Sequence, residues 1–152
     1  MFDHLMTPVQ RSLRDEARAS AKALAAAQAQ LDELEAHDLL AAAVDLPSGA
    51  RAITAIWDDR DAASLRAMAK RLTAAPGMIV LLAIAGERAQ LCFARSRDVA
   101  LDVAPLLRAA LQSLGGAKGG GAPDFAQGGG IAADHATLQR VLENHIRELT
   151  IA

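Results

Sequence analysis

The sequence contains little cysteine and few aromatic residues. It has one cysteine, Cys92, together with one tryptophan, three phenylalanines and no tyrosine in 152 residues. A single cysteine cannot form a disulfide within the chain or supply a cysteine-rich zinc site. Its position in the strand-like run RAQLCFAR predicts a buried, inert thiol. So few aromatic rings leave little scope for stacking on nucleic-acid bases.

Long apolar runs and an excess of either charge are also missing. No run approaches the roughly 20 uncharged apolar residues of a membrane-spanning helix, which excludes a transmembrane protein. The first residues lack the pattern of a secretory signal, so we predict a cytoplasmic location. Sixteen Lys and Arg against 18 Asp and Glu give a net charge of −2. This balance argues against a generic nucleic-acid coat but leaves room for a local basic patch.

Familiar catalytic and metal-binding motifs are absent as well. The four histidines, His4, His37, His135 and His145, include no pair four residues apart, and none has a cysteine at ligand spacing. A zinc site therefore has no support in the sequence. No serine lies in a Gly-x-Ser-x-Gly turn, and Lys118 precedes the central glycines, unlike the lysine of a nucleotide-triphosphate loop. We predict no catalytic residues, no metal and no cofactor.

Residues 1–45 are predicted to form a helical, coiled-coil-like segment. Glycine is absent from Thr7 to about Ala43, and proline is absent after Pro8, which suits the first turn of a helix. A diluted heptad runs along this segment and favours a long helix, a helical hairpin or a modest coiled coil, with a homodimer as one outcome. The seam consists of Met6, Gln10, Leu13, Ala17, Ser20, Leu24, Ala27, Leu31, Leu34 and Asp38.

The charges of this segment are polarised. Its first half carries Arg11, Arg14, Arg18 and Lys22, whereas its second half carries Asp32, Glu33, Glu35 and Asp38. Such runs usually form a solvated face. The four cations are nevertheless candidates for contacts with nucleic-acid phosphates, as are Arg95 and Arg97 later in the chain.

Residues 46–152 are predicted to form a globular α/β domain, a small mixed sheet flanked by helices. The turn residues 46–49 mark its start, and hydrophobic patterns of two periods alternate after it. Three aspartates each precede an amphipathic stretch, and we expect Asp61 or its neighbour, Asp102 and Asp134 to cap helices. The expected order is a strand at 51–57, a helix, strands at 78–85 and 88–95, a helix, a Gly-rich loop and a final helix.

The Gly-rich stretch is the most specific feature of the sequence. Eight of the 11 glycines fall between Gly115 and Gly130, in GGAKGGGAPDFAQGGG. This stretch resembles the GG-x-GGG-x-PD-x-AQ-x-GG signature of the DHH-associated domain at the C-terminus of alanyl-tRNA synthetases and long alanyl-tRNA editing proteins. The order of the predicted elements is similar to that family over nearly the whole chain. Many members carry Arg before the Pro-Asp pair, where this sequence has Ala122.

The resemblance implies a tRNA-binding accessory domain that contacts the outer corner of tRNA and helps hold tRNA(Ala) for charging or editing. A catalytic or editing domain would lie in the same chain or in a partner. The residues that we expect to contact nucleic acid are Lys118, Gly119, Gly120, Gly121, Asp124, Gln127, Arg11, Arg14, Arg18 and Lys22.

The glycines allow two interpretations. Their amides could turn inward to form an anion-binding nest beside Lys118. Alternatively, they could let the segment pack tightly on the sheet while Asp124 and Gln127 bond to main-chain groups. Phe125 could stack on a nucleotide, although a place in the core is the commoner role for phenylalanine.

Two other functions remain open at this point. Domains of this type also accompany DHH phosphoesterases, so the chain could form the substrate-binding half of an enzyme acting on nucleotides or short oligonucleotides. The chain could instead be a structural dimerisation module that uses the heptad seam.

Overall fold

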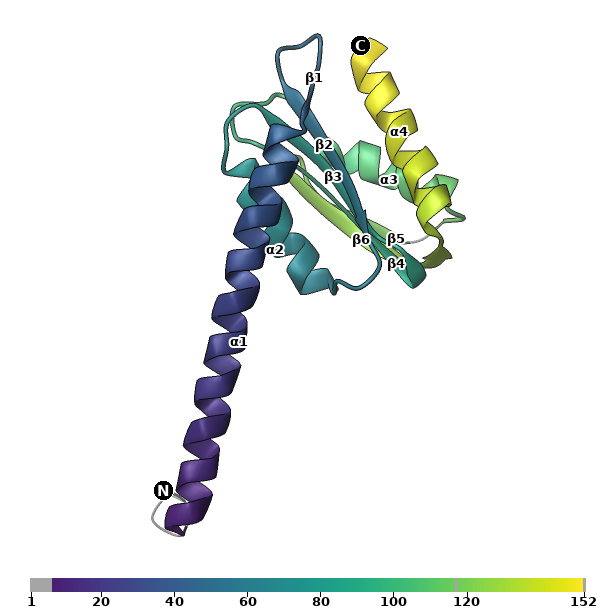
Figure 1. Ribbon diagram of the computed structural model, residues 1–152. Coiled ribbons are helices and arrows are strands. Elements are labelled where there is room, and N and C mark those ends of the chain that lie inside the picture. The colour runs from purple at the N-terminus through teal and green to yellow at the C-terminus, as the bar shows by residue number, and fades with distance from the viewer. Residues whose placement is uncertain (1–6, 117, 152) are drawn as a thin grey trace. The chain divides into compact units, whose positions relative to one another are not determined.

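A computed structural model describes residues 7–116 and 118–151 of the chain (Figure 1). It has the α/β class expected from the sequence: a long helix comes first, and a six-stranded mixed sheet flanked by helices follows. The chain divides into two compact units, one ending at His37 and the other beginning at Asp38. Met6 and His4 lie outside the described residues.

The first helix, α1 (Pro8–Ala41), is continuous. The helical hairpin that the heptad allowed is therefore not formed within the described residues. Thr7 and Gln10 cap the start reciprocally, since the Gln10 amide donates to Thr7 Oγ1 over 3.1 Å and the Thr7 amide donates to Gln10 Oε1 over 2.9 Å. This arrangement is a capping box, and Pro8 occupies the first turn as expected.

The sheet has the strand order β1-β2-β3-β4-β6-β5. Only the β2–β3 pair is parallel, because α2 connects these two strands, while the other neighbours are antiparallel. β3 is buried along its whole length, which confirms the prediction of a central strand. The strands are β1 (Val44–Asp45), β2 (Arg51–Trp57), β3 (Met78–Ile84), β4 (Gly86–Arg95), β5 (Lys118–Ala122) and β6 (Phe125–Ala133).

Three helices cover the sheet, with α2 (Ala62–Thr73) on one face and α3 (Val103–Ser113) and α4 (His135–Ile151) on the other (Figure 1). The three predicted caps are confirmed, because each aspartate side chain accepts a hydrogen bond from an amide in the first turn. The main core lies between the sheet and the α3–α4 pair, around Leu81, Leu91 and Phe93. Burial of these apolar surfaces supplies most of the folding free energy.

The prediction of a loop over the Gly-rich stretch is wrong. Residues 118–133 form the antiparallel strands β5 and β6, which add to the sheet beside β4. The short strand β1 was also not expected from the sequence.

Candidate nucleic-acid interface

The β5–β6 hairpin turns over two residues, Pro123 and Asp124. Proline presets the backbone angle at the second position of such a turn. The register places Ala122 opposite Phe125, Gly120 opposite Gln127 and Lys118 opposite Gly129. β5 therefore forms one edge of the six-stranded sheet. None of its glycines has a positive φ, so the inward-turned nest, one of the two interpretations of these glycines, does not form at Gly119–Gly121.

Close approach between strands explains two of these glycines. A Cβ on Gly119 would lie 2.6 Å from the Cα of Gly128 and 2.6 Å from Leu111 Cδ1, and a Cβ on Gly128 would lie 2.6 Å from the Cα of Gly119 and 2.7 Å from Leu111 Cδ1. Leu111 belongs to α3, so the absence of side chains here lets the helix sit directly on the hairpin. The packing interpretation of the glycines is thus confirmed at these two positions.

Gly120 is different, because no atom lies within 4 Å of the position its Cβ would occupy. Side chains alternate between the faces of a strand, so Gly120 lies on the same face as its neighbours Lys118 and Ala122. Its partner Gln127 lies on that face too, and so does Phe125. We call this surface, made of Lys118, Gly120, Ala122, Phe125 and Gln127, the hairpin face.

The hairpin face lies on the same side of the sheet as α2. Gln127 pairs with Cys92 of β4, and Arg66 of α2 donates from Nη1 to Gln127 Oε1 over 3.5 Å. The Gln127 side chain therefore contacts a cation of α2. Asp124 is exposed, and its main-chain carbonyl accepts from the Arg95 amide over 3.0 Å.

Cys92 lies beneath Arg66 and Lys70 of α2. Burial raises the pKa of its thiol to about 12, although the two nearby cations act in the opposite direction. The thiol is fully buried and forms no disulfide, which confirms the prediction of a buried cysteine; its low reactivity stays a prediction.

Arg66 and Lys70 extend the hairpin face with positive charge, and the sequence did not identify them as site residues. They are one helical turn apart on α2, with Arg66 half-buried and Lys70 exposed. Sixty-one positions separate Arg66 from Gln127. Only the pairing of β6 with β4 brings the two together, and no sequence spacing signals it.

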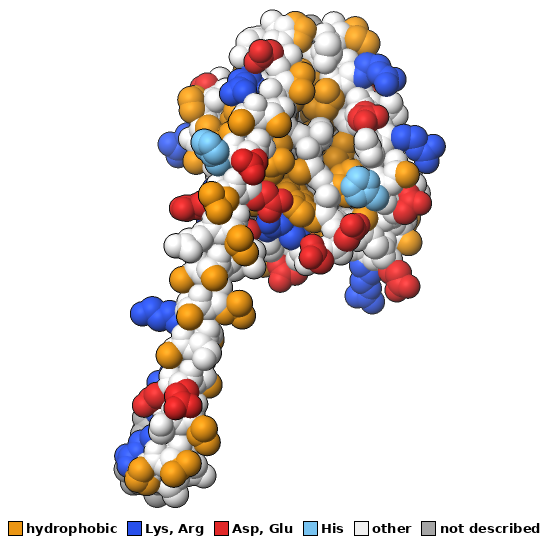
Figure 2. All heavy atoms as spheres, in the orientation of Figure 1, with side chains coloured by type: hydrophobic (Ala, Val, Ile, Leu, Met, Phe, Trp, Pro, Cys, Tyr) orange, Lys and Arg blue, Asp and Glu red, His pale blue; other side chains and the backbone are white. Residues whose placement is uncertain are grey.

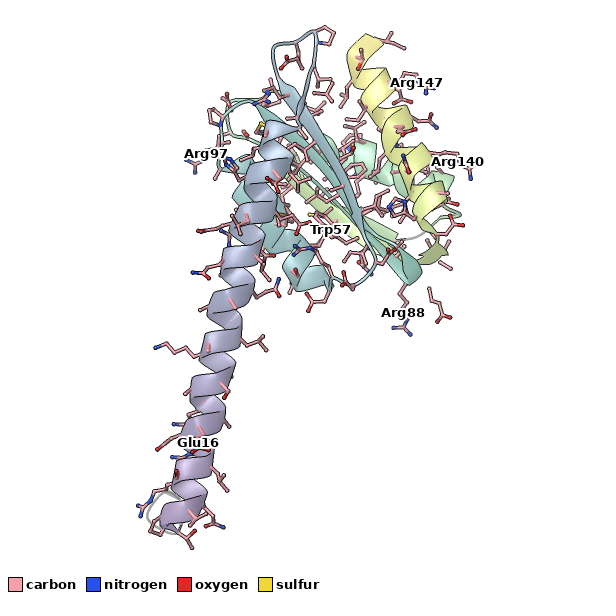
Figure 3. The ribbon with its side chains drawn as sticks, viewed as in Figure 1. Glu16, Trp57, Arg88, Arg97, Arg140 and Arg147 are labelled. Carbon is pink, nitrogen blue, oxygen red and sulfur yellow. The ribbon has the colours of Figure 1, made fainter. Side chains whose placement is uncertain are left out.

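The cationic surface continues past the end of α2. A groove of about 500 Å³ is lined by Lys70, Thr73, Ser96, Arg97 and Asp98, among others. Arg97 is exposed and points away from the body (Figure 3). Arg95 has a structural role instead, since its Nε donates to the Leu101 carbonyl over 2.6 Å.

The other predicted cations, Arg11, Arg14, Arg18 and Lys22, lie on α1 and thus in the other compact unit. Their spacing of three or four residues places them along one side of that helix. All are exposed except Arg14, which is half-buried. Their role in binding stays a prediction.

Among residues 7–116 and 118–151, no group of three or more His, Cys, Asp or Glu side chains is arranged to hold a metal ion. None of the helices in the same residues is long and apolar enough to cross a membrane.

The glycine hairpin at the edge of this mixed sheet is formed by the stretch that resembles DHH-associated domains. The DHHA1 domain family matches residues 49–148, well over half of the chain, and the chain belongs to this family.

Its relatives are alanine–tRNA ligases. The enzyme from Aromatoleum aromaticum is 34% identical over 125 residues, which cover 80% of this chain and 14% of that protein. The enzyme from Leptothrix cholodnii is 37% identical over 125 residues, with 78% and 14% covered. The chain therefore spans only a small part of the length of these relatives.

Solved structures share the fold. The C-Ala domain of Aquifex aeolicus alanyl-tRNA synthetase superimposes with a TM-score of 0.63 at 20% identity, covering 71% of this chain and 97% of that domain. The DHH domain of a member of a family of ribosomal proteins gives a TM-score of 0.53 at 13% identity, covering 85% of this chain and 33% of that one.

Proposed function

We propose that the chain is a tRNA-binding accessory domain that helps hold tRNA(Ala) for aminoacylation or for editing of mischarged tRNA. The observation that carries this proposal is the hairpin face, a nearly side-chain-free strand flanked by Lys118, Arg66 and Lys70. It occurs in a chain whose relatives are alanine–tRNA ligases.

The chemistry of this surface suits a nucleic-acid backbone. Lysine and arginine attract phosphate, and the release of condensed counterions drives such binding. Gly120 presents bare backbone, so a bulky ligand can approach the strand closely. Half-buried Phe125 adds an aromatic surface, and Gln127 adds a polar group able to accept or donate hydrogen bonds.

In this proposal the domain contributes no catalytic residues. The reaction belongs to a catalytic or editing domain, either in the same polypeptide or in a partner, and the whole operates in the cytoplasm. Recognition depends mainly on the shape of folded RNA, which phosphate contacts across a broad surface can read.

Binding to four probes tests the proposal: tRNA(Ala), an unrelated tRNA, a single-stranded RNA and a mononucleotide. Fluorescence anisotropy at two salt concentrations should show micromolar or tighter binding that prefers folded tRNA and weakens with salt. Lys118→Ala should weaken binding, and the double variant Arg14→Glu with Arg18→Glu reports whether α1 takes part. Binding of the mononucleotide alone would favour the substrate-binding half of a DHH-type phosphoesterase. No binding of any RNA at low salt would contradict the proposal.

We also propose that α1 mediates self-association, because its heptad leucines are strongly exposed. Leu13, Leu24, Leu31 and Leu34 are 60%, 71%, 59% and 65% exposed. Figure 2 shows hydrophobic side chains at the surface along this helix. Light scattering should give a mass that rises with concentration, whereas a constant monomer mass would exclude self-association through α1.

A further inference from the structure

We infer that two copies of α1 pair antiparallel, in a register that places Leu24 of one copy against Ala27 of the other. This inference rests on the proposed self-association and adds its direction and register. It follows from three properties of the described helix: the exposure of its seam, the sizes of the seam residues and the distribution of charge along it.

The seam of α1 needs a partner. Large apolar residues repeat at heptad positions from Leu13 to Leu34 and remain exposed, and an apolar stripe of this kind on a 34-residue helix is typical of a coiled-coil contact. The seam also holds the small residues Ala17, Ser20 and Ala27. Two such helices can approach closely where each leucine of one helix packs against a small residue of the other.

The charges select the direction. Between Pro8 and Lys22, four cations and two carboxylates give +2, and between Ala23 and Ala41, four carboxylates without any Lys or Arg give −4. Parallel pairing would place like-charged halves side by side. Antiparallel pairing places the basic half of each helix beside the acidic half of the other, which is favourable.

The sizes of the seam residues select the register. In antiparallel coiled coils each residue of one heptad core position faces the other core position of the partner helix. With Leu24 against the partner's Ala27, Leu31 faces the partner's Ser20 and Leu34 faces the partner's Ala17. Every leucine in the middle of the seam then packs against a small side chain, and Leu13 meets the partner's Asp38 at the ends.

The flanking positions agree with the same register. Arg14 comes nearest to the partner's Glu35, and Glu16 comes nearest to the partner's His37. A shift of one heptad in one direction places Arg14 beside Gln28, and the opposite shift places Glu35 beside Ala21. Both shifts therefore lose the Arg14–Glu35 pair.

Spin labels on the side of α1 away from the seam test this arrangement. We would label the 152-residue chain at Ser12→Cys, Ala19→Cys, Ala26→Cys or Glu33→Cys, all at exposed positions. The native Cys92 thiol is buried and should not compete for the label. At a rise of 1.5 Å per residue, the two labels of a dimer are offset along the axis by about 40, 20, 2 and 22 Å.

The expected result is a V-shaped distance profile with its minimum at residue 26, measured by double electron–electron resonance. Equal short distances at all four positions would overturn the antiparallel direction while leaving self-association intact. A minimum displaced by three or four residues would overturn the register. An absence of intermolecular distances together with a monomer mass would overturn self-association itself.

A charge swap provides an independent check. Arg14→Glu alone and Glu35→Lys alone should each weaken the dimer by several-fold. The double variant should restore its affinity, because the antiparallel register places residue 14 beside residue 35 of the other copy. Failure of the double variant to recover would count against the register.

Discussion

Glycine has distinct roles at neighbouring positions of β5, and this division underlies the candidate interface. Gly119 lies where a Cβ would meet the backbone of Gly128, whereas Gly120 faces open space. The first position serves packing beneath α3, and the second leaves the hairpin face bare. The same residue type is thus required for the fold at one position and available for a ligand at the next.

Gly119→Ala should destabilise the domain by about 1–3 kcal/mol, because the added methyl overpacks a contact with little room to relax. Gly120→Ala is the matched control and should change the free energy of unfolding by less than about 0.5 kcal/mol. Urea denaturation followed by circular dichroism measures both. Equal stability of the two variants would contradict the packing role of Gly119.

Cys92 gives the domain a specific response to alkaline pH. Burial raises the pKa of its thiol from 9.0 to about 12, so the unfolded chain releases this proton before the native chain does. The contribution is fully present below about pH 9 and declines as pH rises towards 12, by at most about 1.4 kcal/mol per unit.

Comparing the pH dependence of unfolding in the wild type and in Cys92→Ala isolates this group from other titrating side chains. The difference in stability between the two proteins should shrink above pH 9. A difference that stays constant from pH 7 to pH 11 would contradict the burial of the thiol.

At the scale of elements, the helices and central strands could be predicted from the sequence, whereas the β5–β6 hairpin could not. Asp61 before the pattern of Leu65, Met68 and Leu72 defines α2, and the run at 78–85 defines β3. The segment KGGGA of β5 has almost no intrinsic preference for a strand, because glycine is depleted in sheets. It becomes a strand through its pairing with β6, which is itself held by β4.

The candidate site was predictable only where a local sequence pattern marks its residues. Lys118 and Gln127 stand within the glycine signature and were identified from it. Arg66 and Lys70 are contributed by a helix more than 40 residues earlier, and no local pattern distinguishes them from other surface cations. Their placement depends on tertiary packing alone.

The α4 cap provides a test at this scale. The Thr137 amide donates to Asp134 Oδ1 over 2.8 Å, and the hydrogen bonds from Thr137 hold the pKa of the Asp134 carboxyl below its ordinary value of 3.8. This stabilisation is present above about pH 4 and is lost as pH falls through the lowered pKa.

Asp134→Ala should lower the Tm at pH 7, and the difference in Tm from the wild type should narrow as the pH falls below the ordinary carboxyl pKa of 3.8. Asp134→Asn should retain more of the stability at pH 7, because asparagine also caps helices well. A difference in Tm independent of pH would show that the carboxylate charge does not contribute.

At the scale of the whole molecule, the two compact units carry different candidate functions. The unit from Asp38 onward carries the hairpin face and its cations, and α1 carries an exposed seam with polarised charge. The boundary predicted after residue 45 stays a prediction. We propose that the globular part binds RNA, with the cations of α1 as further candidate contacts, and that the helix brings two copies together.

Charge reversal on the two faces of the sheet tests the central claim most directly. Arg66→Glu with Lys70→Glu changes the α2 side, and the matched control, Arg140→Glu with Arg147→Glu, changes two exposed residues of α4 on the other side (Figure 3). Affinity for tRNA(Ala) would be measured over a series of salt concentrations for both variants.

The α2 variant should bind at least about tenfold more weakly, and its logarithmic salt slope should fall by about one per cation lost. The α4 variant should bind like the wild type. Equal losses in both variants, or a loss confined to the α4 variant, would contradict the assignment of the hairpin face as the tRNA-binding surface.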